Sequence, residues 1–301
     1  MTLLESMPPT KASDRHVVFV DAVRPQRGPV NFGLARSRER PHGNALTQDE
    51  DAFIRWLFER CGLRASAYRE ETLARRLPAC LRLIGGPVVQ QARAILEDNP
   101  ALQRSALDAL VIGVTSFFRD AGLFRALGER ILPGMIRKDR PLRIWSVGCS
   151  DGQELYSVSL LLVEMGWLHR SVLLGTDCRP GAVARASAGV YDDREIHSMP
   201  ELFRQRYFRH TQAGWRIDPR VRTVVQWRTS DAVQMVEPGA WDIILCRNFV
   251  MYLDPNAACD VWKRLQMSLR AGGVLVVGKA ERPAIEGFYS LAPSIFRRSS
   301  R

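Results

Sequence analysis

Apolar residues recur at intervals of three and four between about residues 49 and 137, a spacing that predicts amphipathic helices. Asn99 followed by Pro100 is a helix-start signal, and Asp120 is predicted to cap a later helix. Pro78 is expected to bend or interrupt the helix that begins near Tyr68. Short helices of this kind predict a small N-terminal helical domain, residues 49–137, that ends in a linker helix.

From residue 138 onward, short apolar runs alternate with helical patterns. Strands are predicted at 143–147, 171–176, 242–246 and 273–278, and helices at 153–166, 180–188 and 257–270. This alternation predicts an α/β domain, residues 138–301, in which a mainly parallel sheet has helices on both faces. A last strand near 294–296 is expected to close the edge of the sheet.

The strand–helix rhythm fails between Pro200 and Gln226. Residues 203–208 have a helical pattern, whereas 215–217 and 221–225 read as two short strands. We therefore expect a small antiparallel β insertion at about 210–228.

Residues 1–48 have little periodicity and contain five prolines at positions 8, 9, 25, 29 and 41. One short run, 16–20, could form a strand. The segment is predicted to be a disordered basic arm, either a grip for an acidic partner or a leader without a function of its own.

The chain has 301 residues, of which 46% are hydrophobic and 25% charged, so a normal packed core is expected. A net charge of +11 and a pI near 9.9 favour acidic partners, unless the charge is spread evenly over the surface. Arg75, Arg76 and Arg82 lie on one predicted helix. They are a candidate docking face for an acidic helical partner, or an ordinary solvated helix face.

None of the six cysteines forms C-x-x-C or zinc-finger spacing with histidine, and the five histidines fall outside every motif described below. We expect reduced thiols, a cytoplasmic location and no metal site. No apolar run approaches the roughly 20 residues of a membrane span, and the N-terminus lacks the apolar core of a signal peptide.

The strongest local motif is a strand, a glycine-containing turn from Gly148 to Gly152, and then a helix. Such a turn can offer backbone N–H groups to a nucleotide-like ligand. Asp177 follows Gly152 by 25 residues, close to the roughly 20 expected for a ribose-binding acid. Because the turn is not G-x-G-x-x-G, S-adenosylmethionine (SAM) is favoured over a nicotinamide dinucleotide. The alternative is an ordinary βα turn with a surface aspartate.

Four segments in order carry a family resemblance. They are Val114-Thr-Ser-Phe-Phe-Arg-Asp120, Arg143-Ile-Trp-Ser146 with Glu154-Leu-Tyr-Ser157, Gly175-Thr-Asp-Cys178 with Ala186-Ser-Ala-Gly-Val-Tyr191, and Asp242-Ile-Ile-Leu-Cys-Arg-Asn248 with Tyr252-Leu-Asp254. Together they resemble the chemotaxis receptor methyltransferases of the CheR type, over about residues 50–298. That family uses SAM to methylate glutamate side chains of chemoreceptors. The resemblance implies a Rossmann-like class I methyltransferase sheet and a chemoreceptor-like partner with acidic methylation helices.

The resemblance also implies roles for individual residues. Arg119 and Tyr252 are expected beside the transferred methyl group, Glu154 near the methionine amino group, and Asp177 on the ribose or adenine side. The full set implied to contact SAM is Gly113, Thr115, Arg119, Gly148, Glu154, Asp177, Asp231, Ala232, Arg247 and Asn248.

The sequence departs from the family pattern at several positions. Gly113 and Asp231 stand where the family usually has asparagine, and Gln153 and Leu155 replace Glu and Pro. Residues 279–281, Lys-Ala-Glu, stand where the family often has His-Ser-Glu. The loop at 211–215 is short, whereas members that dock a receptor's C-terminal pentapeptide have a longer, glycine-rich loop. This chain therefore resembles the pentapeptide-independent kind.

Two other functions remain open from the sequence. One is SAM-dependent methylation of another substrate, such as RNA, a small carboxylic acid or a different protein; the basic charge keeps RNA possible, although Arg247-Asn-Phe249 differs from the N-P-P-Y of enzymes that methylate adenine or glutamine amides. The other is a non-catalytic SAM-binding scaffold, because fold does not fix function.

Overall fold

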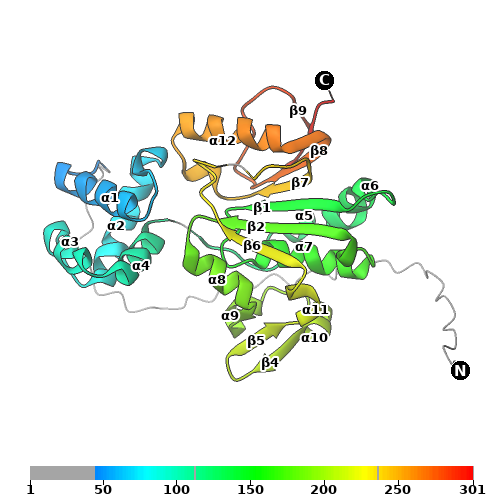
Figure 1. The fold of residues 1–301 in the computed structure, drawn as a ribbon, viewed down its shortest axis with the longest axis horizontal. Coiled ribbons are helices and arrows are strands. Elements are labelled where there is room, and N and C mark those ends of the chain that lie inside the picture. The colour runs from blue at the N-terminus through cyan, green and yellow to red at the C-terminus, as the bar shows by residue number, and fades with distance from the viewer. Residues whose placement is uncertain (1–44, 112, 236, 301) are drawn as a thin grey trace, which may run out of the picture.

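The computed structural model describes residues 45–111, 113–235 and 237–300 (Figure 1). Almost all of the arm predicted at 1–48, including its possible strand at 16–20, lies outside the described residues. The first helix of the described residues begins at Gln48.

Four helices form a group at one side of the sheet (Figure 1): α1 (Gln48–Arg60), α2 (Glu70–Ile84), α3 (Val89–Glu97) and α4 (Pro100–Leu110). Thr47 and Glu50 form a capping box at the start of α1, and the Asn99 side chain accepts from the Leu102 N–H at the start of α4. Of the two effects predicted for Pro78, an interruption of α2 does not occur, because the helix continues past it to Ile84.

The main sheet has seven strands in the order β6-β2-β1-β7-β8-β10-β9. Their bounds are β1 (Leu142–Val147), β2 (Ser171–Asp177), β6 (Val225–Thr229), β7 (Trp241–Cys246), β8 (Leu269–Val277), β9 (Phe288–Ala292) and β10 (Ile295–Arg298). The first five are parallel, whereas β10 pairs antiparallel with β8 and β9. This doubly wound order confirms the predicted Rossmann-like α/β class. The edge strand is β9 rather than the predicted strand at 294–296, which lies one place inside the edge as β10.

Both faces of the sheet are buried. Along β8, Val274 and Val276 belong to one hydrophobic core, and Leu275 and Val277 belong to the other. Such alternation follows from the two-residue period of a strand. One core includes α1–α4 and α12 (Pro255–Ser268), so the helical group and that face of the sheet share one apolar interior.

The other face packs against the helices that connect the first strands and against the small sheet. These elements are α5 (Ala121–Ala126), a π segment at Leu127–Ile131, α6 (Leu132–Met135), α7 (Gln153–Glu164), α8 (Pro180–Ala188), α9 (Asp193–Ile196), α10 (Glu201–Tyr207) and α11 (Pro219–Arg222). Short 3-10 turns occur at Ala65–Ala67, Leu168–Arg170 and Val250–Tyr252.

The small antiparallel sheet has the order β3-β5-β4, with β3 at Val190–Tyr191, β4 at Phe208–Thr211 and β5 at Gly214–Ile217. It confirms a small antiparallel insertion but corrects its second half. Residues 221–225 do not form an insertion strand. They span the end of α11 and the start of β6, which pairs with β2 in the main sheet. Only Val225 of β6 is buried and Trp227 is half-buried, so this strand has the same short apolar pattern as a strand of a small antiparallel insertion, and the sequence could not separate the two.

Asp242 on β7 ties three segments together at the amino-terminal end of the strands. Its carboxylate, with 0% of the side chain exposed, accepts two 2.8 Å hydrogen bonds from Arg140 and one from the Arg143 N–H. Arg270, before the bend in β8, lies 3.0 Å from the same carboxylate. This cluster fixes β7 between its two neighbours.

Replacing Asp242 with alanine is expected to lower the free energy of unfolding by about 3 kcal/mol, because it leaves two guanidinium groups without their buried partner. Urea denaturation monitored by circular dichroism measures the change. Asp260→Asn, at an exposed position of α12, is the control and should change stability by less than about 0.5 kcal/mol. Equal stability of the two variants would contradict the assigned role of Asp242.

Candidate active site

A cavity opens at the carboxyl ends of four neighbouring parallel strands, β6, β2, β1 and β7. It encloses about 130 Å³, and its walls come from the segments after these strands and from the loop between α4 and α5. After β1 the chain adds β2 and β6 on one side of that strand and then crosses to β7 on the other side. The cavity therefore lies at the topological switch point, where open α/β sheets bind ligands. Ten of the lining residues are those implied by the resemblance: Gly113, Thr115, Arg119, Gly148, Glu154, Asp177, Asp231, Ala232, Arg247 and Asn248, with Tyr252 as an eleventh.

The glycine turn after β1 has left-handed backbone at Gly148 (φ 63°), Ser150 (φ 51°) and Gly152 (φ 87°). Side chains other than Gly, Asn and Asp rarely adopt this conformation, so the strain at Ser150 marks a constrained site. The motif suggested that this turn offers its backbone N–H groups to a ligand, but two of them are already bonded within the protein. The Cys149 N–H donates to the Thr176 carbonyl, and the Ser150 N–H donates to Asp177 at 2.9 Å.

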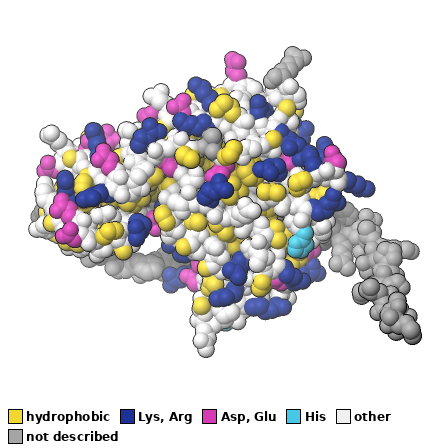
Figure 2. All heavy atoms as spheres, viewed as in Figure 1, with side chains coloured by type: hydrophobic (Ala, Val, Ile, Leu, Met, Phe, Trp, Pro, Cys, Tyr) yellow, Lys and Arg dark blue, Asp and Glu magenta, His cyan; other side chains and the backbone are white. Residues whose placement is uncertain are grey.

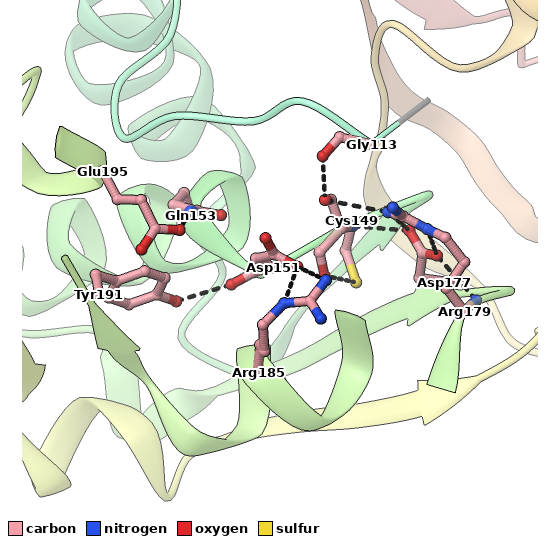
Figure 3. Close-up of polar contacts among 10 residues, drawn as sticks. Gly113, Cys149, Asp151, Gln153, Asp177, Arg179, Arg185, Tyr191 and Glu195 are labelled. Atoms are coloured by element: carbon pink, nitrogen blue, oxygen red, sulfur yellow. Dashed lines mark hydrogen bonds and ion pairs between the residues drawn. The ribbon is translucent and has the colours of Figure 1, made fainter. Parts of the chain in front are cut away.

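Asp177 ends β2 and is 5% exposed. Arg179, two residues later and equally buried, lies against it: Arg179 Nε is 2.9 Å from Asp177 Oδ1, and Nη2 is 3.2 Å from Oδ2 (Figure 3). Burial works against the charged form of Arg179, but Asp177 outweighs it and raises the arginine pKa. The resemblance implied no role for Arg179, which sequence reasoning missed.

Arg247, directly after β7, is buried between two acids. Its Nη1 donates to Glu154 Oε2 at 2.9 Å, and its Nη2 donates to Asp120 Oδ2 at 2.6 Å and to the Arg119 carbonyl at 3.0 Å. Glu154 also accepts from the Ser146 hydroxyl at 2.9 Å. One guanidinium therefore connects β7, the start of α7 and the loop that carries Arg119.

Asp120 is the N-cap residue of α5, as predicted, but its side chain makes no capping hydrogen bond. Its backbone is left-handed (φ 68°), and its carboxylate pairs with Arg247 and, at 2.6 Å, with Lys279. Burial opposes ionisation, but Lys279 and Arg247 outweigh it and lower the pKa of Asp120. Phe118 is also left-handed (φ 49°), so strained backbone flanks Arg119 on both sides.

Glu281, after β8, is a second residue that sequence reasoning missed. It is 3% exposed, and its carboxylate accepts four backbone N–H groups, at 2.7–3.1 Å, from residues 248, 249, 251 and 278. These bonds hold the loop that carries Asn248 (φ 56°) and Tyr252. A glutamate shortly after an apolar strand was visible in the sequence, but nothing in the sequence identified the amides it binds.

The N-terminal helical group supports the other side of the same loop. The Arg69 N–H donates to the Tyr252 carbonyl at 3.0 Å, and Arg69 Nε donates to the Leu253 carbonyl at 2.9 Å. Asp254 in turn donates its N–H to the Ala67 carbonyl at 2.9 Å. The cavity is thus shaped by residues from both halves of the chain.

The arginines expected to dock a partner on α2 lie outside this cavity. Arg75 and Arg82 are exposed, whereas Arg76 is only half-buried and its Nε donates to the Ala109 carbonyl at 2.9 Å. On the face drawn in Figure 2, Lys and Arg side chains are scattered over the helical group and the sheet domain, with acids among them. The positive charge of this face is therefore spread widely, and it is not concentrated over α2.

The chemistry of the lining residues favours binding and alignment over covalent catalysis. Burial raises the pKa of the Cys149 and Cys178 thiols, which disfavours the thiolate form that a nucleophile needs.

No group of three or more metal-ligating side chains occurs among residues 45–111, 113–235 and 237–300. In the same part of the chain, no helix is both long and apolar enough to cross a membrane.

The cavity wall combines charged and apolar groups. Glu154 and Asp177 contribute carboxylates, and Ala232 and Phe249 contribute apolar surface, a combination that fits a ligand with both cationic and apolar parts such as SAM. Two protein donors reach Glu154, so about two of its four acceptor positions remain for a ligand.

Comparison with known proteins gives the same cofactor. The model of the CheR methyltransferase SAM-binding domain matches residues 113–288, more than half of the chain. A chemotaxis protein methyltransferase of Listeria monocytogenes is 27% identical over 248 residues, which cover 82% of this chain and 95% of that protein. Chemotaxis protein methyltransferase 1 of Pseudomonas aeruginosa is 30% identical over 254 residues, covering 79% and 91%. A probable biofilm formation methyltransferase of Pseudomonas putida is 30% identical, covering 77% and 56%.

The matched region begins at the loop before Arg119 and ends in the edge strand of the sheet, so it contains every strand of the cavity. The chain therefore belongs to the CheR methyltransferase family and carries its SAM-binding domain.

Proposed function

We propose that this protein transfers a methyl group from SAM to glutamate side chains of a chemoreceptor-like protein and so forms glutamate methyl esters. The observation that carries the proposal is the position of Arg119. Arg119 lines the same cavity as Glu154 and Tyr252, and its guanidinium donates a 2.9 Å hydrogen bond to the Val114 carbonyl. A planar guanidinium is suited to orient an incoming carboxylate by paired hydrogen bonds.

When bound, SAM supplies a methyl group on a positively charged sulfur. A glutamate side chain has a pKa of about 4.3 and is already ionised near neutral pH, so it needs no general base to attack that carbon. The protein's part is then to align the two reactants and to exclude water from the carboxylate. Raised thiol pKa values in the cavity agree with a mechanism of this kind.

We assign the remaining roles within the same proposal. Glu154 holds the methionine amino group, Asp177 the ribose, and Tyr252 flanks the methyl group. Thr115, Asn248, Asp231 and Ala232 complete the cofactor contacts, while Arg247 keeps Glu154 and the Arg119 loop in place. Residues 49–137 form a helical domain whose α2 arginines Arg75 and Arg82 face the acidic receptor helices.

The small sheet supports a pentapeptide-independent mode of receptor binding. Its β4–β5 hairpin pairs Thr211 directly with Gly214, so only residues 212 and 213 form the connection. Such a tight turn leaves no long glycine-rich segment to bind a receptor tail. We therefore place receptor docking on the helical domain and the cavity rim.

Arg119→Ala is expected to lower the rate of methyl transfer about 100-fold, because the carboxylate loses its orienting partner. The dissociation constant for S-adenosylhomocysteine should change less than about threefold, which is under 1 kcal/mol. Tritiated methyl transfer to a receptor cytoplasmic fragment, counted as alkali-released methanol, measures the rate, and calorimetry measures binding. Arg137→Ala, at an exposed position outside the cavity, is the control. Label that survives mild alkali would exclude an ester product, and an undiminished rate would remove Arg119 from the mechanism.

The rate of methyl transfer is expected to be flat from about pH 6 to 9 and to fall only as the pH approaches the glutamate pKa of about 4.3. The rate falls toward low pH because protonation removes the reactive carboxylate form of the acceptor glutamate. The same tritium assay at saturating SAM, in buffers of constant ionic strength, measures the profile. A tenfold rise per pH unit up to neutrality would instead require a general base.

Glu281→Gln is expected to lower the free energy of unfolding by about 2 kcal/mol, because an amide oxygen cannot accept four backbone N–H groups as the carboxylate does. Methyl transfer should fall as well, since Asn248 and Tyr252 lose their fixed loop. Chemical denaturation and the tritium assay test both effects, with exposed Glu286→Gln as the matched control. Unchanged activity in a destabilised variant would limit Glu281 to a structural role.

A further inference from the structure

We propose that Arg179 is a displaceable counter-ion that closes the ribose side of the cofactor pocket until SAM enters. This inference rests on the proposed placement of SAM, with its ribose at Asp177, and adds a control of cofactor entry that is built into the chain itself.

The argument begins with the acceptor capacity of Asp177. A carboxylate offers about four lone-pair positions. Protein donors already reach all of them: Oδ1 accepts from Arg179 N at 3.0 Å and Nε at 2.9 Å, and Oδ2 accepts from Ser150 N at 2.9 Å and Arg179 Nη2 at 3.2 Å. A ribose diol can therefore donate to Asp177 only after hydrogen bonds from the guanidinium are broken. Glu154 differs, because it keeps positions open for an ammonium group.

Gly113 provides the space that the Arg179 guanidinium occupies. A Cβ atom at position 113 would lie 2.0 Å from Arg179 Nη1 and 2.3 Å from its Cζ, well inside van der Waals contact. Any other side chain at this position would push the guanidinium away. The departure from asparagine at Gly113 is thus what permits Arg179 to sit inside the pocket.

Ser150 completes the closed arrangement. Its hydroxyl donates to the Gly113 carbonyl at 2.8 Å and accepts from Arg179 Nη2 at 3.1 Å (Figure 3). The guanidinium is therefore held by the acid at the end of β2, by the glycine turn after β1 and by the loop before Arg119. These are the three segments that would surround a bound ribose.

The need to displace Arg179 weakens the binding of SAM. Its hydrogen bonds and ion pair with Asp177 stabilise the free protein, and they must be broken before the ribose can bind. Removing the guanidinium would leave Asp177 with only backbone donors in the free protein, whereas ribose hydroxyls would still satisfy it in the complex. Binding should then become tighter, and the free protein should become less stable.

The test is calorimetric titration of the full chain with S-adenosylhomocysteine. Arg179→Met is expected to bind at least tenfold more tightly than the unmodified chain, a change of about 1.4 kcal/mol. Gly113→Ala should give a similar gain by expelling the guanidinium, and the double variant should gain little more, because both changes remove one interaction. Arg185→Met, on the helix α8 that Arg179 precedes, is the matched control. Arg185 pairs with Asp151 outside the cavity, and its loss should leave the affinity unchanged.

Thermal unfolding gives a second readout without activity. Arg179→Met should lower the melting temperature of the free protein and enlarge the upward shift that S-adenosylhomocysteine produces. If Arg179→Met does not fold, Gly113→Ala carries the test, since it leaves Arg179 in the chain.

Two results would overturn the proposal in distinguishable ways. Equal or weaker binding by both Arg179→Met and Gly113→Ala, while Asp177→Ala loses binding, would show that Arg179 supports the ribose site and does not block it; the proposed SAM placement would stand. Undiminished binding by Asp177→Ala would remove the ribose from that carboxylate, and the proposed placement would fail together with the inference.

Discussion

The buried guanidinium of Arg247 is the interaction on which the candidate site depends. It is 3% exposed and joins Glu154 on α7 to Asp120 and the Arg119 carbonyl on the loop before α5. Two acids placed this close would repel one another without the positive charge between them. With it, the left-handed backbone at Phe118 and Asp120 is held in one conformation, and Arg119 between them lines the cavity. The sheet sets where this happens, because the carboxyl ends of β1 and β7 lie side by side.

A second carboxylate, Glu281, organises the loop after β7 through four backbone amides, and the N-terminal helical group holds the same loop through Arg69. The two supports come from opposite ends of the chain. The loop after β7, which lines the cavity, is therefore held by residues from both halves of the chain. The proposed methyl transfer to an ionised carboxylate needs such rigidity, because it depends on alignment and removal of water and not on proton transfer.

The structure shows what the residues at three of the departures from the family pattern contact. Gly113 lacks a side chain at the point where the Arg179 guanidinium enters the pocket, so the two positions form a pair. Lys279 binds Asp120 and so belongs to the same charge network as Arg247. Gln153 is buried, and its amide donates to Glu195 at 3.2 Å, which ties the start of α7 to the small sheet's helix α9. None of these three changes removes a charged group from the cavity wall.

The sequence by itself determined the fold class, because the apolar period, the glycine turn and the acid after β2 are local signals. The family resemblance, carried by four motifs in order, named eleven of the twenty residues that line the cavity. It could not distinguish β6 from an insertion strand, since a short apolar run has the same pattern in either place. Only the tertiary structure decided which partners the charged groups take. The Arg179 side chain pairs with Asp177, the Asp120 carboxylate pairs with Arg247 and makes no capping hydrogen bond, and Glu281 accepts N–H groups from a loop about thirty residues earlier. The partners of a charged side chain are the donors and acceptors that folding brings within about 3 Å, and such contacts leave no periodic pattern in the sequence.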